Sequence, residues 1–147
     1  MENLHRYIGL LNSRARRYFD HHLSEYALDH NYSTYIIHIV KIEGIRQDQL
    51  ADHLGVNRSS VKRAIEHLEK HGYATRKVYE FDKRKYTLHP TQKAHDMFDK
   101  IMQLKREWND ILTEGFSDDE RELISSMILD MNKNAKEHIK NEIKAKT

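Results

Sequence analysis

Cysteine is absent from this chain of 147 residues. Disulfide bonds, thiol nucleophiles, thiolate metal ligands and cysteine-based peroxide sensing are therefore excluded. A single proline and five glycines favour long helices over a β-sandwich. No apolar run approaches the ~18 residues that a membrane helix needs, and the N-terminus lacks the apolar segment of a signal peptide. We therefore expect a cytoplasmic protein with no membrane partner.

Acidic residues are scarce in the middle of the chain. Residues 46–93 contain 11 of the 25 Lys and Arg residues and 6 of the 23 Asp and Glu residues, which gives a net charge of +5. The rest of the chain contains 14 Lys and Arg residues and 17 Asp and Glu residues, which gives a net charge of −3. This concentration of positive charge is expected where the middle segment meets a polyanion, and an uneven distribution without functional meaning is the alternative.

Apolar residues recur three and four positions apart through most of the chain, which predicts amphipathic helices. The first helix is expected over about 3–27, and a second runs from a capping Ser33 to about Ile42. A long helix follows over about 91–114. Ser117 and Glu120 form a capping box at the start of a final helix, which we expect to fray over 140–147.

The segment between these helices predicts a helix-turn-helix. A short helix in IRQDQLADHLG ends at Gly55, which suits a left-handed position, and Val56 is expected to plug the turn. Asn57 then caps a helix over about 58–70 that ends at Gly72. Two short helices joined by a tight turn that contains glycine form this motif. Its inward positions are Leu50, Ala51, Leu54, Val61, Ile65 and Leu68.

Residues 73–80 and 84–89 are rich in β-prone side chains and predict two strands around a turn near residues 81–83. A hairpin at this position is the wing of a winged helix-turn-helix. The cationic side chains near its tip can reach phosphates or the minor groove beside the preceding helix.

The predicted fold is mainly α with a small β-hairpin wing. Residues 31–90 form the DNA-binding core, and residues 1–30 and 91–147 form flanking helices. Those flanking helices have broad apolar faces that a small core cannot cover, so a second copy of the chain is the expected partner. A monomer whose terminal helices fold back onto the core is the alternative.

With these elements in place, the chain resembles the MarR family of bacterial transcription regulators over nearly its full length. The specific part runs from QDQLADHLGVNRSSVKRAIEHLEKHGY through FDKRKY, where Asp82 and Arg84 look like the family's wing Asp-x-Arg pair. The resemblance implies that Arg84 enters DNA and that Asp82 helps to fix the wing. The chain departs from the family at Arg46, where a Ser or Thr cap is common, and at Pro90 and Ala94, where Leu and Gly are usual.

The resemblance also implies a homodimer that binds a pseudo-palindromic operator, usually to repress nearby genes. A small ligand, often a phenolic or aromatic anion, then loosens the complex. No cofactor is implied.

Candidate DNA-binding residues follow from the helical period. With Val61, Ile65 and Leu68 facing inward, the side chains in the N-terminal half of the helix over 58–70 point outward toward a major groove. These and the wing cations can serve bases or phosphates, whereas ordinary solvated surface residues are the alternative. The predicted set is Asn57, Arg58, Ser59, Ser60, Lys62, Arg63, Arg76, Lys77, Asp82, Lys83, Arg84 and Lys85.

A ligand pocket is expected between the flanking helices and the core. Its candidate walls are aromatic and thioether side chains, with an arginine for an anionic ligand, although aromatic residues at helical spacing more often belong to the core. The candidates are Arg14, Arg17, Tyr18, Tyr35, Met97 and Phe98.

Eleven histidines raise the alternative of a zinc-responsive regulator. Adjacent His21 and His22 point in different directions on a helix, which favours surface or capping histidines and no metal site. The chain has no phosphate loop, nucleophile elbow or dinucleotide fingerprint, so we expect no enzymatic activity. A nucleoid-type or protein-interaction winged-helix module without operator preference is the remaining alternative.

Overall fold

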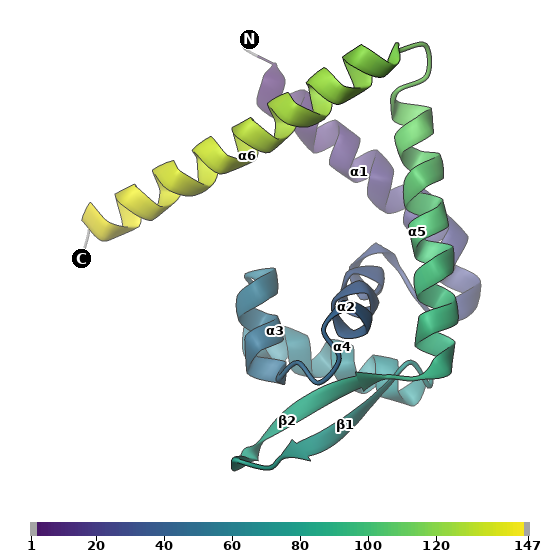
Figure 1. The fold of residues 1–147 in the computed structure, drawn as a ribbon, viewed down its shortest axis with the longest axis vertical. Coiled ribbons are helices and arrows are strands. Elements are labelled where there is room, and N and C mark those ends of the chain that lie inside the picture. Colours follow the sequence, from purple (N-terminus) through teal and green to yellow (C-terminus); the bar gives the residue numbers. More distant parts are fainter. Residues whose placement is uncertain (1–2, 146–147) are drawn as a thin grey trace. The chain divides into compact units, whose positions relative to one another are not determined.

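The computed structural model describes residues 3–145, whose ribbon is drawn in Figure 1. The chain forms two compact units, which divide after Glu107. The fold is mainly helical with one antiparallel hairpin, as predicted. No helix in the described range is long and apolar enough to cross a membrane. The first unit contains α1 (Leu4–Leu23), the 3-10 turn η1 (Ser24–Tyr26), α2 (His30–Lys41), α3 (Gln47–Leu54), α4 (Arg58–Lys70), β1 (Ala74–Tyr79), β2 (Asp82–Pro90) and most of α5 (Gln92–Leu112). The second begins at Trp108 and contains α6 (Asp118–Ala145).

The core of the first unit is built from the apolar faces of its helices and the base of the hairpin. The predicted stripe of α4 is confirmed, because Val61, Ile65 and Leu68 are each 0% exposed. Burying such side chains is the main favourable contribution to folding. Their fully buried neighbours from the other elements include Leu23, Ile36, Ile39, Leu50, Tyr73, Leu88 and Ile101.

The start of α2 differs from the prediction. Asp29 is the N-cap, and its carboxylate accepts a hydrogen bond from the Tyr32 N–H at 2.8 Å. Ser33 lies inside the helix, is 1% exposed and donates its hydroxyl to the carbonyl of His30 at 2.6 Å. The Ser33 cap is therefore wrong. A serine in the first turn can satisfy its hydroxyl on the helix backbone, so a hydroxyl does not by itself mark a helix start.

The turn between α3 and α4 is closed by the backbone rather than by an apolar plug. Gly55 adopts the predicted left-handed conformation at φ 64°, and the Val56 N–H donates to the Ala51 carbonyl at 3.1 Å. The Val56 side chain is 39% exposed. The prediction that Val56 plugs the turn is therefore wrong. At the other end of α3, the Gln49 side chain accepts from the Arg46 N–H at 3.1 Å and completes a helix start that lacks Ser or Thr.

The wing, which is the β1–β2 hairpin, is anchored at its base and projects at its tip (Figure 1). Leu88 is fully buried, and its N–H donates to the Ile45 carbonyl at 2.9 Å. Val78 pairs with Tyr86, and the register shifts before Tyr79, which pairs with Asp82. The connecting turn is therefore residues 80–81, slightly earlier than predicted.

In the second unit, the predicted capping box is confirmed. The Ser117 hydroxyl accepts from the Glu120 N–H at 3.3 Å, and the Glu120 carboxylate accepts from the Ser117 N–H at 2.8 Å. Helix α6 then continues to Ala145. The predicted fraying is therefore wrong for residues 140–145. Residues 146–147, the last two of that prediction, lie outside the described range.

Candidate nucleic-acid interface

The first half of α4 presents the predicted polar side chains outward from a capped helix start. The Asn57 Oδ1 atom accepts from the Ser60 N–H at 2.8 Å and from the Ser59 hydroxyl at 2.7 Å. Arg58, Ser59, Lys62 and Arg63 are exposed, and Ser60 is half-buried. Because the Asn57 oxygen is committed to the cap, its amide NH₂ is the part of that side chain suited to an incoming phosphate.

The wing pair Asp82 and Arg84 is joined through two parallel hydrogen bonds. The Arg84 Nε and Nη2 atoms lie 3.1 Å and 3.3 Å from the two carboxylate oxygens, and the Arg84 N–H also donates to Asp82. The Arg84 side chain is nevertheless 90% exposed. The guanidinium and then the backbone N–H lower the pKa of Asp82, and Asp82 raises the pKa of Arg84. The pair therefore presents an oriented, permanently charged guanidinium to solvent.

An ion-pair cluster that sequence reasoning missed joins α3 to the wing. Asp48 accepts from the Arg46 Nε at 3.0 Å and from the Lys85 Nζ at 3.3 Å. Its pKa is lowered to about 2, chiefly by the hydrogen bond from Arg46 and less by the one from Lys85, against an opposing effect of burial. Lys85, predicted to contact DNA, is therefore paired within the protein. An acidic residue at the start of a short helix gave no signal of a partner 37 positions later.

Arg76 also has an internal partner. Its Nε lies 2.9 Å from a carboxylate oxygen of Glu69 on α4, and its guanidinium lies 5.3 Å from the ring centroid of Tyr86. These contacts fix the wing against α4. A phosphate contact by Arg76 would have to share this ion pair, whereas Lys77 and Lys83 are exposed on the outer strand and tip.

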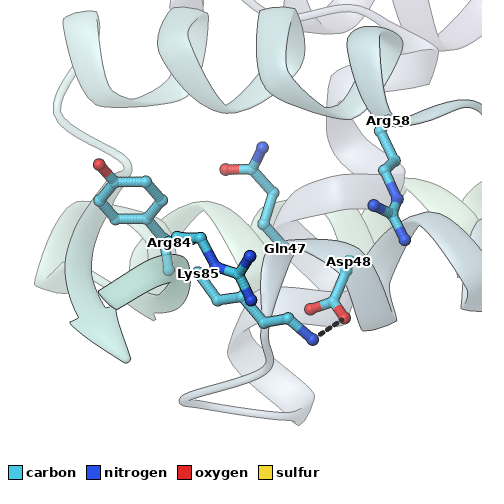
Figure 2. Close-up of a pocket in the computed structure, with 6 residues that line it drawn as sticks. Gln47, Asp48, Arg58, Arg84 and Lys85 are labelled. Carbon is cyan, nitrogen blue, oxygen red and sulfur yellow. Dashed lines mark hydrogen bonds and ion pairs between the residues drawn. The ribbon is translucent and has the colours of Figure 1, made fainter. Parts of the chain in front are cut away.

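A cleft of about 150 Å³ lies where α3, α4 and the wing converge (Figure 2). It brings together three of the predicted cationic residues, because Arg58 enters from α4 and Arg84 and Lys85 from β2. Gln47, Asp48 and Tyr86 complete its lining. The Gln47 Oε1 atom is buried without a hydrogen-bond partner among the described residues. Three cations around a polar cleft can hold one phosphate group, with Asp48 limiting the excess charge.

The predicted ligand residues lie in different environments. Tyr35 and Met97 are 2% and 6% exposed and belong to the core, Phe98 is half-buried, and Arg14 and Arg17 are exposed on α1. The Tyr18 hydroxyl donates to Glu107 at 3.2 Å, and burial followed by this hydrogen bond raises the pKa of Tyr18. A carboxylate at that point repels an anionic ligand, so Tyr18 itself is poorly placed to receive one.

Two histidines four residues apart, which sequence reasoning did not single out, lie at the end of α4, where His71 is the C-cap. The rings of His67 and His71 are 4.4 Å apart, and the His67 Nε2 lies 2.6 Å from the carbonyl of Ala27. Tyr32 stacks on His67 at 4.0 Å. Within residues 3–145, no group of three or more His, Asp or Glu side chains is arranged to hold a metal ion. The contacts of His67 with Ala27 and Tyr32 place its ring between α4 and the segment after α1.

A buried helix-turn-helix with an exposed basic face and an anchored wing defines a winged-helix DNA-binding protein. Residues 28–85 match the model of the MarR family. A MarR protein from Peptoclostridium difficile is 28% identical, with a TM-score of 0.86 over 92% of this chain and 89% of that one. A MarR family regulator from Listeria monocytogenes, solved in complex with a 26-mer DNA, is 25% identical, with a TM-score of 0.81 over 91% and 89% of the two chains.

A relative from Bacillus subtilis, the HTH-type transcriptional regulator YybA, is 29% identical over 100 residues, which is 68% of this chain and 67% of the relative. Over residues 28–85 and in its fold, the chain is similar to transcription regulators of the MarR family. The family and these relatives are transcription regulators and not enzymes.

Proposed function

We propose that this protein is a dimeric repressor that binds a pseudo-palindromic operator and is released by a small ligand. The observation that carries the DNA-binding part is Arg84, whose guanidinium is oriented by Asp82 and is 90% exposed. An oriented, solvated arginine on a projecting hairpin suits the minor groove. The DNA complex of the Listeria monocytogenes relative supports the same partner.

The recognition helix, α4, is proposed to enter the major groove by its N-terminal half. Arg63 or Lys62 would pair with a guanine edge, and Ser59 and Ser60 would serve bases or phosphates. Lys62 lies 3.8 Å from Glu66, and both side chains are largely exposed, so this ion pair holds Lys62 only weakly. Arg58, which lines the cleft, would bind a DNA phosphate there. Lys77, Lys83 and Lys85 would add contacts to the DNA backbone.

The dimer is proposed to form through residues 1–30 and 91–147. Exposed apolar side chains on α1 and α6 support this dimer, since exposed apolar helix faces are uncommon on monomeric proteins. On α1, Tyr7 and Ile8 are 56% and 47% exposed, and on α6, Met127 and Ile128 are 54% and 57% exposed. A two-fold dimer would place two recognition helices about one DNA turn apart, ~34 Å, which suits two half-sites.

The releasing ligand is proposed to be a small aromatic or phenolic anion that binds between the flanking helices and the DNA-binding core. Arg14 and Arg17 of α1 are exposed and offer it positive charge. Phe98 would contribute a half-buried aromatic wall.

The experiment compares binding to the DNA upstream of the protein's own gene with binding to a scrambled duplex of equal length, at several salt concentrations. Arg84→Ala removes one proposed contact, and Lys41→Ala, at an exposed position of α2, removes the same charge elsewhere. We expect preference for the upstream DNA, lost in Arg84→Ala and kept in Lys41→Ala. The slope of log affinity against log salt should fall by ~1 only in Arg84→Ala.

Two outcomes would contradict this function. Equal, salt-sensitive binding to both duplexes would indicate a nucleoid-type protein, and no binding to either would indicate a protein-interaction module. A zinc-responsive regulator would instead bind the upstream DNA with an affinity that changes on addition of zinc.

A further inference from the structure

The tip of the wing exposes an aromatic ring that the contacts proposed so far do not use. Phe81 is 78% exposed, the largest value among the exposed large hydrophobic side chains of residues 3–145. It forms the two-residue turn of the hairpin with Glu80. Scattered apolar residues on a surface are ordinary, so exposure alone assigns Phe81 no role.

One aromatic neighbour contacts the ring, and the backbone after the turn is fixed by hydrogen bonds. Tyr79 contacts it edge-on, with ring centroids 5.3 Å apart at 63°. Directly after it, Asp82 accepts hydrogen bonds from both the backbone N–H and the guanidinium of Arg84. Tyr79 therefore restricts the Phe81 ring on one side, and Asp82 orders the backbone that follows it. Such ordering before contact lowers the entropic cost of an interface that the ring enters.

The wing has two further exposed apolar side chains. Val78 and Tyr86 face each other across the two strands and are 55% and 39% exposed. Tyr86 in turn lines the cleft between α3, α4 and the wing. The wing therefore exposes apolar side chains both near the cleft and at its tip, and the exposed cations Lys83 and Arg84 follow Phe81 in the sequence.

We propose that Phe81 is an apolar DNA contact that packs into the minor groove beside Arg84 and acts as a wedge at a base step. This rests on the proposed function. Charge favours this occupant, because the cations Lys77, Lys83 and Arg84 outnumber the two acidic residues of the segment 77–84 and attract a polyanion. Phenylalanine is among the side chains that minor-groove proteins press between base steps.

Glu80, the other turn residue, cannot fill this role because phosphates repel its carboxylate. The wedge also predicts a sequence preference that hydrogen bonds do not supply. Pyrimidine–purine steps unstack most easily, so DNA with such a step under the tip should bind more tightly than DNA with a stiff A-tract there.

Phe81→Ser and Phe81→Leu test the contact in the full-length protein with the upstream DNA. Because the ring is exposed, both variants should melt at the wild-type temperature. Phe81→Ser should weaken binding roughly five- to 100-fold, the range for losing an aromatic contact to a base. Phe81→Leu should retain most of the affinity, and neither variant should change the salt slope, since no charge is removed.

Phe81→Trp gives a direct readout. Its fluorescence should change on adding the upstream DNA by more than that of the wild type, whose single tryptophan is Trp108. Unchanged affinity in Phe81→Ser, a salt slope lowered by ~1, or no extra fluorescence change would overturn the wedge and leave the DNA-binding function standing. Failure of the wild type to prefer the upstream DNA would overturn both, and loss of self-association in Phe81→Ser would assign the ring to another copy of the chain.

Discussion

Replacing Asp48 with asparagine tests the ion-pair cluster that joins α3 to the wing. The change keeps the shape of the side chain and removes the charge that holds Arg46 at 3.0 Å and Lys85 at 3.3 Å. The Asp48 side chain is 21% exposed, so part of its interaction with the two cations is shielded from water. We therefore expect the variant to fold with a lower free energy of unfolding at neutral pH.

The magnitude follows from the pKa of Asp48. A fall from 3.8 to about 2 corresponds to roughly 2.4 kcal/mol at ~1.36 kcal/mol per pKa unit. Solvent screens this value, because the Lys85 side chain is 42% exposed and Arg46 is 27% exposed. The expected loss in Asp48→Asn is therefore about 1 kcal/mol. Asp52→Asn, at an exposed position on the same helix, should cause no destabilisation.

The loss should depend on pH with a definite sign. Because folding lowers the pKa of Asp48, its stabilisation is complete above the pKa of the unfolded chain, near 4, and is lost as the pH falls toward about 2. Urea unfolding followed by circular dichroism should show a constant difference between wild type and Asp48→Asn from pH 8 to pH 5, narrowing below pH 4. Equal stability at pH 7 would refute the ion-pair argument. A difference that persists undiminished at pH 3 would assign the loss to packing of the amide instead of to charge.

Three further variants test the cap, the wing anchor and the proposed dimer. Asn57→Ala removes the acceptor for the Ser60 N–H and should cost about 1 kcal/mol in urea unfolding; a neutral result would mean that water replaces the cap. Leu88→Ala leaves a cavity at a fully buried position and should cost about 2–5 kcal/mol. A loss below 1 kcal/mol there would show that the wing base is not anchored as described. Ile128→Glu places a charge on the exposed apolar face of α6 and should halve the mass in sedimentation equilibrium, whereas an unchanged dimer would place the interface elsewhere.

Elements defined by local signals were predicted well. The recognition helix was expected over about 58–70 and is Arg58–Lys70, because Asn57 caps it and its apolar stripe repeats at the helical period. The Ser117 capping box is a similar case. Where two local signals compete, the sequence is ambiguous. Asp29 and Ser33 both suit a helix start, and packing of the segment after α1 decides for Asp29.

The outward direction of the proposed DNA contacts could also be predicted, whereas their internal partners could not. Arg63 and Ser59 point away from a stripe whose period is written in the sequence. Arg76 and Lys85 instead found carboxylates on α4 and α3, residues Glu69 and Asp48. A side chain that is charged and flexible pairs with whatever the fold brings within about 4 Å, so composition alone cannot tell a phosphate-binding lysine from a paired one.

The sequence by itself determined the winged helix-turn-helix, its basic middle segment and the Asp82–Arg84 pair, because each depends on neighbours within a few residues. The tertiary structure alone decided the cleft that Arg58 lines, the ion-pair cluster around Asp48 and the exposure of Val56. It also left Phe81 as an exposed ring in the turn of the wing. These features depend on contacts between elements distant in sequence. Such contacts form only when buried apolar faces bring α3, α4 and the wing together, and no periodicity in the chain encodes their distances.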